Sequence, residues 1–319
     1  MWHAVSGESG LVYDTGNGSY PLPATSRHGV TDLAASEFFL ETSAEKGRLR
    51  GLAWEIERPR GRIAIIHGLG DHAARYRHVA EELAFHGFAV EAIDLPGHGK
   101  STGTRGHVRH WDDYRNAVAI WMKRSEDLPG SEARAILGQS MGAFVALDWA
   151  LDHPNDVRAL VLCGAPFEVV LRPSMLKVKA AQLAAKVWPR FSQGNTILPS
   201  MLSRDPEVIR AHSADPLVHY QITARLFFEF QRIKTELMRR APDLAVDTLI
   251  IHGGADPISS VVGAQRWAAK TPEGRVTCRF YPGLLHEVLN ELERKDVMQD
   301  VVGWLDRVMP GRIGADGTG

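Results

Sequence analysis

The sequence predicts an α/β fold in which a mostly parallel central sheet is flanked by helices, with a helical cap inserted after the sixth strand. Short apolar runs that suit buried strands alternate with segments of helical periodicity, as in parallel βαβ units. The chain has 319 residues, 44% of them hydrophobic, which is enough for one large domain with an insertion. The alternation stops between Cys163 and about Leu244, where a segment rich in Met, Leu, Ala and aromatic residues intervenes.

The elements follow in chain order. Two early runs are expected to form antiparallel strands at the sheet edge, Glu37–Thr42 and Gly51–Glu57. Later apolar runs predict buried strands near Ile63–Ile66, Ala89–Ile93, Ala135–Leu137, Ala159–Leu162, Leu249–Ile251 and Thr277–Phe280. Helical periodicity predicts helices near Arg75–His86, Trp111–Ser125, Met141–Leu151, Gly263–Lys270 and Lys295–Val308.

These elements divide the chain into an N-terminal extension (1–33), a core (34–164 and 245–310), the cap (165–244) and a C-terminal tail (311–319). Within the cap, Leu176, Ala180, Leu183 and Val187 recur at helical spacing. One interpretation is a helix packed on the core. The alternative is a lid whose apolar face touches a membrane or lipid-droplet surface, or lines an acyl tunnel.

The pentapeptide Gly138-Gln139-Ser140-Met141-Gly142 joins a predicted strand to a predicted helix. A serine on such a turn, with glycine two positions to each side, is typical of the nucleophile elbow of acyl-transfer hydrolases. Glycine relieves the crowding of the tight turn and leaves the serine hydroxyl exposed above the sheet. The same pattern also occurs in flexible loops, so the interpretation depends on partners for Ser140.

Asp256 and His286 are the candidate partners. Each follows a predicted strand, and the chain order serine, acid, histidine is that of open α/β sheets with this elbow. A serine hydroxyl needs a base to take its proton, and the base needs an acid that orients it. Asp256 before proline could instead open a turn, and His286 is one of 14 histidines.

Two backbone N–H groups are predicted to form an oxyanion hole. One belongs to Met141, directly after Ser140, and the second to Leu69, in the glycine-rich loop after the run Arg62–Ile66. His67 at the start of this loop is interpreted as a brace for the loop. Asp94 and His98, in a tight glycine-containing turn, are interpreted in the same way and not as a second acid and base.

Composition excludes several classes of protein. The formal charge is −1, so nucleic acid is not expected as a partner. The two cysteines, Cys163 and Cys278, lie in predicted buried strands and are expected to be small core residues. The first twenty residues lack the features of a secretion signal and no run suits a bilayer span, so a cytoplasmic location is expected, with peripheral membrane contact through the cap as an extension of it. The sequence does not indicate an oligomeric state.

Six segments together resemble the monoacylglycerol lipase and lysophospholipase group of the α/β-hydrolase superfamily, over about Glu37 to Val308, and its bacterial monoacylglycerol lipases in particular. They are His67–Gly70, Asp94–Ser101, Gly138–Gly142, Ser203–Pro206, Asp215–Val218 and Tyr281–Glu287. The elbow is common to many hydrolases, whereas the two cap segments are more specific to this group. One departure is Gln139, where many members of the group carry histidine.

The resemblance implies a serine hydrolase that cleaves medium- or long-chain monoacylglycerols through an acyl-enzyme, with Ser140, Asp256 and His286 as the catalytic residues and no metal or organic cofactor. The expected partner is a lipid ester. Cap residues that would contact it are Leu176, Leu183, Val187, Ile197 and Leu198. The alternatives are a lysophospholipase or broad carboxylesterase and, from another class, a catalytically silent ligand-binding member of the fold.

Overall fold

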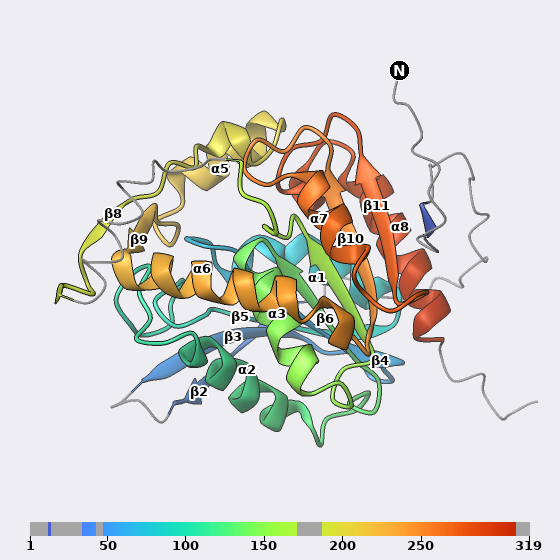
Figure 1. Ribbon diagram of the computed structural model, residues 1–319. Coiled ribbons are helices and arrows are strands. Elements are labelled where there is room, and N and C mark those ends of the chain that lie inside the picture. The colour runs from blue at the N-terminus through green and yellow to red at the C-terminus, as the bar shows by residue number, and fades with distance from the viewer. Residues whose placement is uncertain (1–11, 14–33, 43–46, 171–186, 311–319) are drawn as a thin grey trace, which may run out of the picture.

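A nine-stranded sheet forms the centre of the computed structural model, which describes residues 12–13, 34–42, 47–170 and 187–310 (Figure 1). The strand order is β1-β11-β10-β7-β6-β4-β5-β3-β2. Strand β3 runs antiparallel to both of its neighbours, and the other pairs are parallel. The bounds are β1 Val12–Tyr13, β2 Ser36–Glu41, β3 Arg48–Trp54, β4 Gly61–Ile66, β5 Phe88–Ile93, β6 Arg134–Gln139, β7 Ala159–Cys163, β10 Asp247–Gly253 and β11 Val276–Tyr281.

Helices cover both faces of this sheet. Buried side chains of α1 (Arg77–Phe85) and α8 (Arg294–Val308) share one apolar cluster with one face of the strands. The second cluster joins the other face to α2 (Asp112–Ser125), α3 (Met141–Asp152), α6 (Ala224–Arg239) and α7 (Val261–Ala268). Short 3₁₀ turns are η1 Ala73–Tyr76, η2 Pro199–Met201, η3 Ala241–Asp243 and η4 Val288–Asn290.

Strand β4 shows why the central strands are continuous apolar runs. Ile63 and Ile65 belong to the cluster beneath α1 and α8, while Ala64 and Ile66 belong to the opposite one. Because successive side chains of a strand point to opposite faces, a sheet covered on both faces needs apolar residues at every position. The three-layer architecture confirms the predicted fold class.

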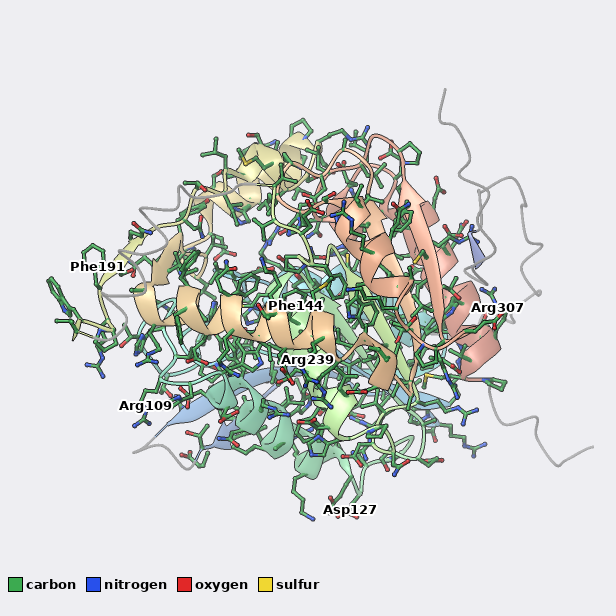
Figure 2. All side chains as sticks on the ribbon, viewed as in Figure 1. Arg109, Asp127, Phe144, Phe191, Arg239 and Arg307 are labelled. Carbon is green, nitrogen blue, oxygen red and sulfur yellow. The ribbon has the colours of Figure 1, made fainter. Side chains whose placement is uncertain are left out.

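The chain between β7 and β10 is the segment that the sequence predicts to be a cap, and it is called the cap below. Its described part holds β8 (Ser192–Gly194), which pairs antiparallel with β9 (Gln221–Thr223), and the helix α5 (Pro206–Ala214). These elements lie away from the central sheet, whereas α6 lies beside α3 in the helical layer on one face of the sheet (Figure 1). Figure 2 shows Phe144 of α3 near the middle of the molecule and Phe191 at the outer edge of the cap. The ring of Phe144 stacks on that of Phe230 in α6, with 5.4 Å between the ring centroids. Helix α6 is therefore part of the core layer by packing, although it lies within the predicted range 165–244.

Among the described residues, Val12 and Tyr13 form an element that no local pattern predicts. Val12–Tyr13 forms a short strand parallel to β11, in register with Thr277 and Cys278.

Both cysteines are free and buried. Within the described ranges, none of the helices is long and apolar enough to cross a bilayer.

Candidate active site

Ser140 lies between the end of β6 and the first residue of α3, in a strained backbone conformation. Its φ is 53° and its ψ is −116°, and among the described residues it alone, glycines apart, has a positive φ. Such conformations are costly for a residue with a side chain and cluster at functional sites. The elbow geometry expected from the pentapeptide is thus present.

The flanking glycines allow this turn because no side chain would fit at either position. A Cβ on Gly138 would lie 2.4 Å from the carbonyl oxygen of Gly142, and one on Gly142 would lie 2.2 Å from the carbonyl oxygen of Ile66. The Ser140 N–H donates to the carbonyl of Cys163 at 2.8 Å, which fixes the elbow to the end of β7.

Asp256 and His286, from the loops after β10 and β11, are brought together. His286 Nδ1 lies 2.7 Å from Asp256 Oδ2, and both side chains are almost fully buried. The other carboxylate oxygen accepts the N–H groups of Ile258 at 2.7 Å and Ser259 at 3.1 Å. These bonds fix the carboxylate, and Nε2 is the ring nitrogen of His286 that does not contact it.

Asp256 and His286 shift each other's pKa in the direction that favours the charged form of each side chain. Burial would raise the pKa of Asp256, but the charges of and hydrogen bonds from His286 and His252 outweigh it and hold that pKa far below its usual range. Burial would lower the pKa of His286, but the Asp256 carboxylate outweighs it, so the pKa of His286 lies above its usual value.

His252 is a second histidine on the same carboxylate. Its Nε2 lies 3.0 Å from Asp256 Oδ2 and 3.1 Å from the carbonyl oxygen of Ser259, and the side chain is fully buried at the end of β10. The Ser259 hydroxyl donates to Asp256 Oδ2 at 2.8 Å. Sequence reasoning did not single out His252 or Ser259, although both lie within four residues of Asp256.

Gln139 stands where many members of the group that this sequence resembles carry histidine. It contacts the loop after β11 that carries His286, called the histidine loop below. Its Nε2 donates to the carbonyl oxygen of His286 at 3.3 Å, and a Cβ on Gly164 would lie 3.2 Å from both Gln139 Nε2 and His286 Cε1. The residue before Ser140 therefore bonds to the backbone that carries the candidate base.

The loop after β4 passes directly over Ser140. A Cβ on Gly68 would lie 3.4 Å from the Cβ of Ser140, and Leu69 lines the same pocket as Ser140. The N–H of Met141 belongs to the first turn of α3, where N–H groups lack acceptors within the helix. Of the two predicted oxyanion donors, Met141 thus adjoins Ser140 in the chain and Leu69 lines the pocket with it.

His67 braces this loop. Its Nε2 accepts the N–H of Leu95 at 2.9 Å, and its Nδ1 donates to the carbonyl of Gly68 at 2.7 Å. Burial lowers the pKa of His67, which is consistent with a neutral ring. Asp94 also binds backbone, accepting the N–H groups of Ala73 at 2.7 Å and Lys100 at 2.8 Å.

His98 makes a local contact as well. Its Nδ1 donates to the carbonyl of Pro96 at 3.0 Å, and burial lowers its pKa well below the usual value. Asp94 and His98 therefore support the turn and do not form an acid–base pair with each other.

Ser140 and His286 line one pocket together with residues of two other segments. The loop after β4 (Gly68–Asp71), called the oxyanion loop below because it carries a predicted oxyanion donor, contributes Leu69. The cap contributes Ile197, Leu202 and several polar side chains. The full lining is Gly68, Leu69, Gly70, Asp71, Gln139, Ser140, Asn195, Ile197, Leu202, His212, His219, Tyr220, His286 and Glu287.

Of the cap residues predicted to contact the substrate, the structure places one in the pocket and two outside it. Ile197 lines the pocket, whereas Val187 and Leu198 are 77% and 56% exposed and do not. Leu176 and Leu183 lie outside the described residues. The lining includes His212 and Tyr220, whose side chains meet at 3.1 Å and which the apolar pattern of the cap could not indicate.

The two cap segments that carry the resemblance contact two different loops of the core. In Ser203–Pro206, the Ser203 hydroxyl donates to the carbonyl of Asn290 at 2.8 Å, and Arg204 pairs with Glu291 at 3.2 Å. In Asp215–Val218, Asp215 Oδ2 accepts from His72 Nε2 at 2.9 Å. The first segment is therefore fixed to the histidine loop and the second to the loop after β4.

Comparison with known proteins agrees with the fold. The sheet, the serine elbow and the Asp–His pair are those of an α/β-hydrolase. Residues 57–293 match the family model described as serine aminopeptidase, S33. The chain belongs to this family of serine hydrolases, which confirms the superfamily inferred from the six motifs.

Relatives with assigned activities are similar over most of their length. A monoacylglycerol lipase of Mycolicibacterium smegmatis is 34% identical over 77% of this chain and 88% of that protein. Phospholipase YtpA of Bacillus subtilis is 28% identical over 80% of this chain and 98% of that protein. The crystal structure of the Paleococcus ferrophilus monoacylglycerol lipase superposes with a TM-score of 0.73 at 24% identity, covering 85% of this chain and 98% of that one.

Proposed function

We propose that this protein is a serine esterase that hydrolyses medium- and long-chain monoacylglycerols to fatty acid and glycerol. The observation that carries the proposal is the 2.7 Å contact between His286 and Asp256 at a pocket that His286 shares with the strained Ser140. The similarity to a bacterial monoacylglycerol lipase supports the choice of substrate.

In the proposed mechanism, Ser140 attacks the ester carbonyl while His286 Nε2 takes the hydroxyl proton. The Asp256 carboxylate holds the imidazole in the required tautomer and stabilises the imidazolium that forms. His286 then gives the proton to the departing glycerol oxygen. A water molecule activated by His286 attacks the acyl-enzyme and releases the fatty acid.

The tetrahedral oxyanion would be stabilised by the N–H groups of Leu69 and Met141. Loss of one such donor typically lowers turnover by about 10²- to 10³-fold. The N-terminal end of α3 adds a favourable partial charge at the same position.

The pocket suits an ester with a small polar leaving group. Asn195, His212 and Tyr220 offer hydrogen-bonding groups, and Leu69, Ile197 and Leu202 offer apolar contact. A lipid surface is the proposed partner of the cap, because large apolar side chains of its described part are exposed, among them Val187, Trp188, Phe191 and Leu198.

A substrate panel tests this function. It compares medium- and long-chain monoacylglycerols with a short soluble ester, a triacylglycerol, lysophosphatidylcholine and an aminoacyl amide. The proposal predicts the highest kcat/KM for the monoacylglycerols. Equal turnover of all esters would favour a broad carboxylesterase. A preference for lysophosphatidylcholine would favour a lysophospholipase. If no ester is turned over and a fluorophosphonate does not label the protein, a silent member of the fold would be favoured.

A further inference from the structure

Arg75, at the end of the turn that follows the oxyanion loop, binds two buried carboxylates at once. Its Nη1 and Nη2 lie 3.0 and 2.7 Å from the two carboxylate oxygens of Glu287. Nη1 also lies 3.1 Å from Oδ1 of Asp71. The three side chains are only 11%, 6% and 5% exposed for Arg75, Glu287 and Asp71. Paired hydrogen bonds of this kind fix direction as well as distance.

Each carboxylate adjoins one half of the proposed catalytic machinery. Asp71 lies two residues after Leu69, the proposed oxyanion donor, and Glu287 directly follows His286, the proposed base. Asp71 and Glu287 both line the pocket at Ser140. Arg75 therefore joins two loops that are 212 positions apart in sequence at the point where both must face one ester.

Further bonds hold the two carboxylates in place. Tyr76 Oη donates to Asp71 Oδ2 at 2.9 Å. Asn290 Nδ2 donates to Glu287 Oε2 at 2.7 Å, and the Glu287 N–H donates to the carbonyl of Leu202 in the cap at 2.8 Å. The cluster thus also touches the cap, so three walls of the pocket share it.

The cluster remains ionised in spite of its burial. Burial would raise the pKa of Asp71, but Arg75, together with smaller contributions from His67 and His72, outweighs it and lowers the pKa to about 2. The Arg75 guanidinium also lowers the pKa of Glu287. A buried ion pair gains little stability over apolar residues of similar size, and a fixed geometry is what it can supply instead.

We propose that Asp71, Arg75 and Glu287 form a positioning cluster that sets the oxyanion loop against His286 in the transition state. This inference rests on the proposed function, because it assigns the cluster to the alignment of groups in acyl transfer. The three residues are positioning residues: they act on the reaction through Leu69 and His286.

Glu287→Gln is the decisive variant, since it keeps the size of the side chain and removes its charge and one half of the paired bond. With a short soluble ester, we expect kcat to fall about tenfold and KM to stay within about twofold, because misplacement of reacting groups by about 1 Å can slow catalysis by about 10²-fold. Affinity for a boronic acid, which forms a tetrahedral adduct on serine, should fall by a similar factor. A role limited to stability would change neither quantity below the melting temperature.

Asp152→Asn is the matched control, because Asp152 also pairs with two arginines, Arg115 and Arg240, at the opposite end of α3. It should leave kcat and boronic acid affinity unchanged. If Glu287→Gln does not fold, Arg75→Lys, which keeps the cation and loses the paired bond, carries the same test and the same expectation.

Two negative results remain distinguishable. The positioning role alone would be overturned by the following result. The wild-type protein reacts with a fluorophosphonate, and a folded Glu287→Gln or Arg75→Lys variant keeps wild-type kcat and boronic acid affinity. A wild-type protein that neither hydrolyses esters nor reacts with the fluorophosphonate would overturn the proposed function, and this inference with it.

Discussion

His286 and His252 approach the same carboxylate oxygen of Asp256, His286 through Nδ1 at 2.7 Å and His252 through Nε2 at 3.0 Å. With the Ser259 hydroxyl at 2.8 Å, this oxygen has three polar neighbours in a site closed to solvent. Asp256 is therefore fixed before any substrate arrives, and it fixes His286 in turn.

Asp256→Asn should lower kcat by about 10⁴-fold, the loss seen when a triad aspartate is replaced by asparagine and the histidine adopts the wrong tautomer. Steady-state kinetics on a soluble ester measure this loss. Asp247→Asn, at the other end of β10 in an exposed pair with Arg275, is the control and should remain within about twofold of wild type. A variant at position 256 with near-normal kcat would remove Asp256 from the mechanism.

The pH profile should report His286. Its pKa is raised above the ordinary value of about 6.5 because the Asp256 charge outweighs burial, with a smaller contribution in the same direction from Glu287. Protonated His286 cannot accept the serine proton, so kcat/KM should fall as the pH drops through a value above about 6.5. In Asp256→Asn this acidic limb should move to lower pH. An unchanged limb would assign it to another group.

Gly142→Ala should disrupt the elbow, because its Cβ would lie 2.2 Å from the carbonyl oxygen of Ile66 and 2.5 Å from that of His67. We expect loss of ester hydrolysis and a lower melting temperature. Gly303→Ala is the control, since its Cβ in α8 meets nothing within 4 Å. It should raise the free energy of unfolding by about 0.5–1 kcal/mol and leave activity unchanged. Calorimetry and urea unfolding separate the two outcomes.

Trp188→Ser tests contact between the cap and a lipid surface. Trp188 is 65% exposed, and its ring lies 5.6 Å from that of Phe191. The substitution should slow hydrolysis of emulsified monoacylglycerol and leave turnover of a soluble ester unchanged. Phe85→Ser, 55% exposed on α1, is the matched control and should affect neither rate. Equal effects of the two substitutions on the emulsion would argue against a specific surface on the cap.

Local patterns predicted most of the fold. The central strands are apolar at every position because helices cover both faces of the sheet, so runs such as Ile63–Ile66 stand out. The triad candidates could be found because each follows a strand in a fixed chain order. Both kinds of signal are contained in a few neighbouring residues.

Contacts between distant segments could not be predicted in this way. Arg75 and Glu287 are 212 positions apart, and neither belongs to a motif that specifies its partner. The strand Val12–Tyr13 is too short to show periodicity, and only its pairing with β11 defines it. The polar lining from His212 and Tyr220 depends on how the cap lies over the pocket, which the apolar stripe at 176–187 does not encode.

The most direct test of the account is covalent labelling of wild type and Ser140→Ala with a fluorophosphonate probe, read by intact mass and by the mass of the labelled peptide. We predict that wild type gains one adduct at Ser140, that labelling slows as the pH falls and His286 becomes protonated, and that Ser140→Ala gains none. Labelling of Ser140→Ala at the wild-type rate, or an adduct on another residue of the wild type, would contradict the assignment of Ser140 as the nucleophile.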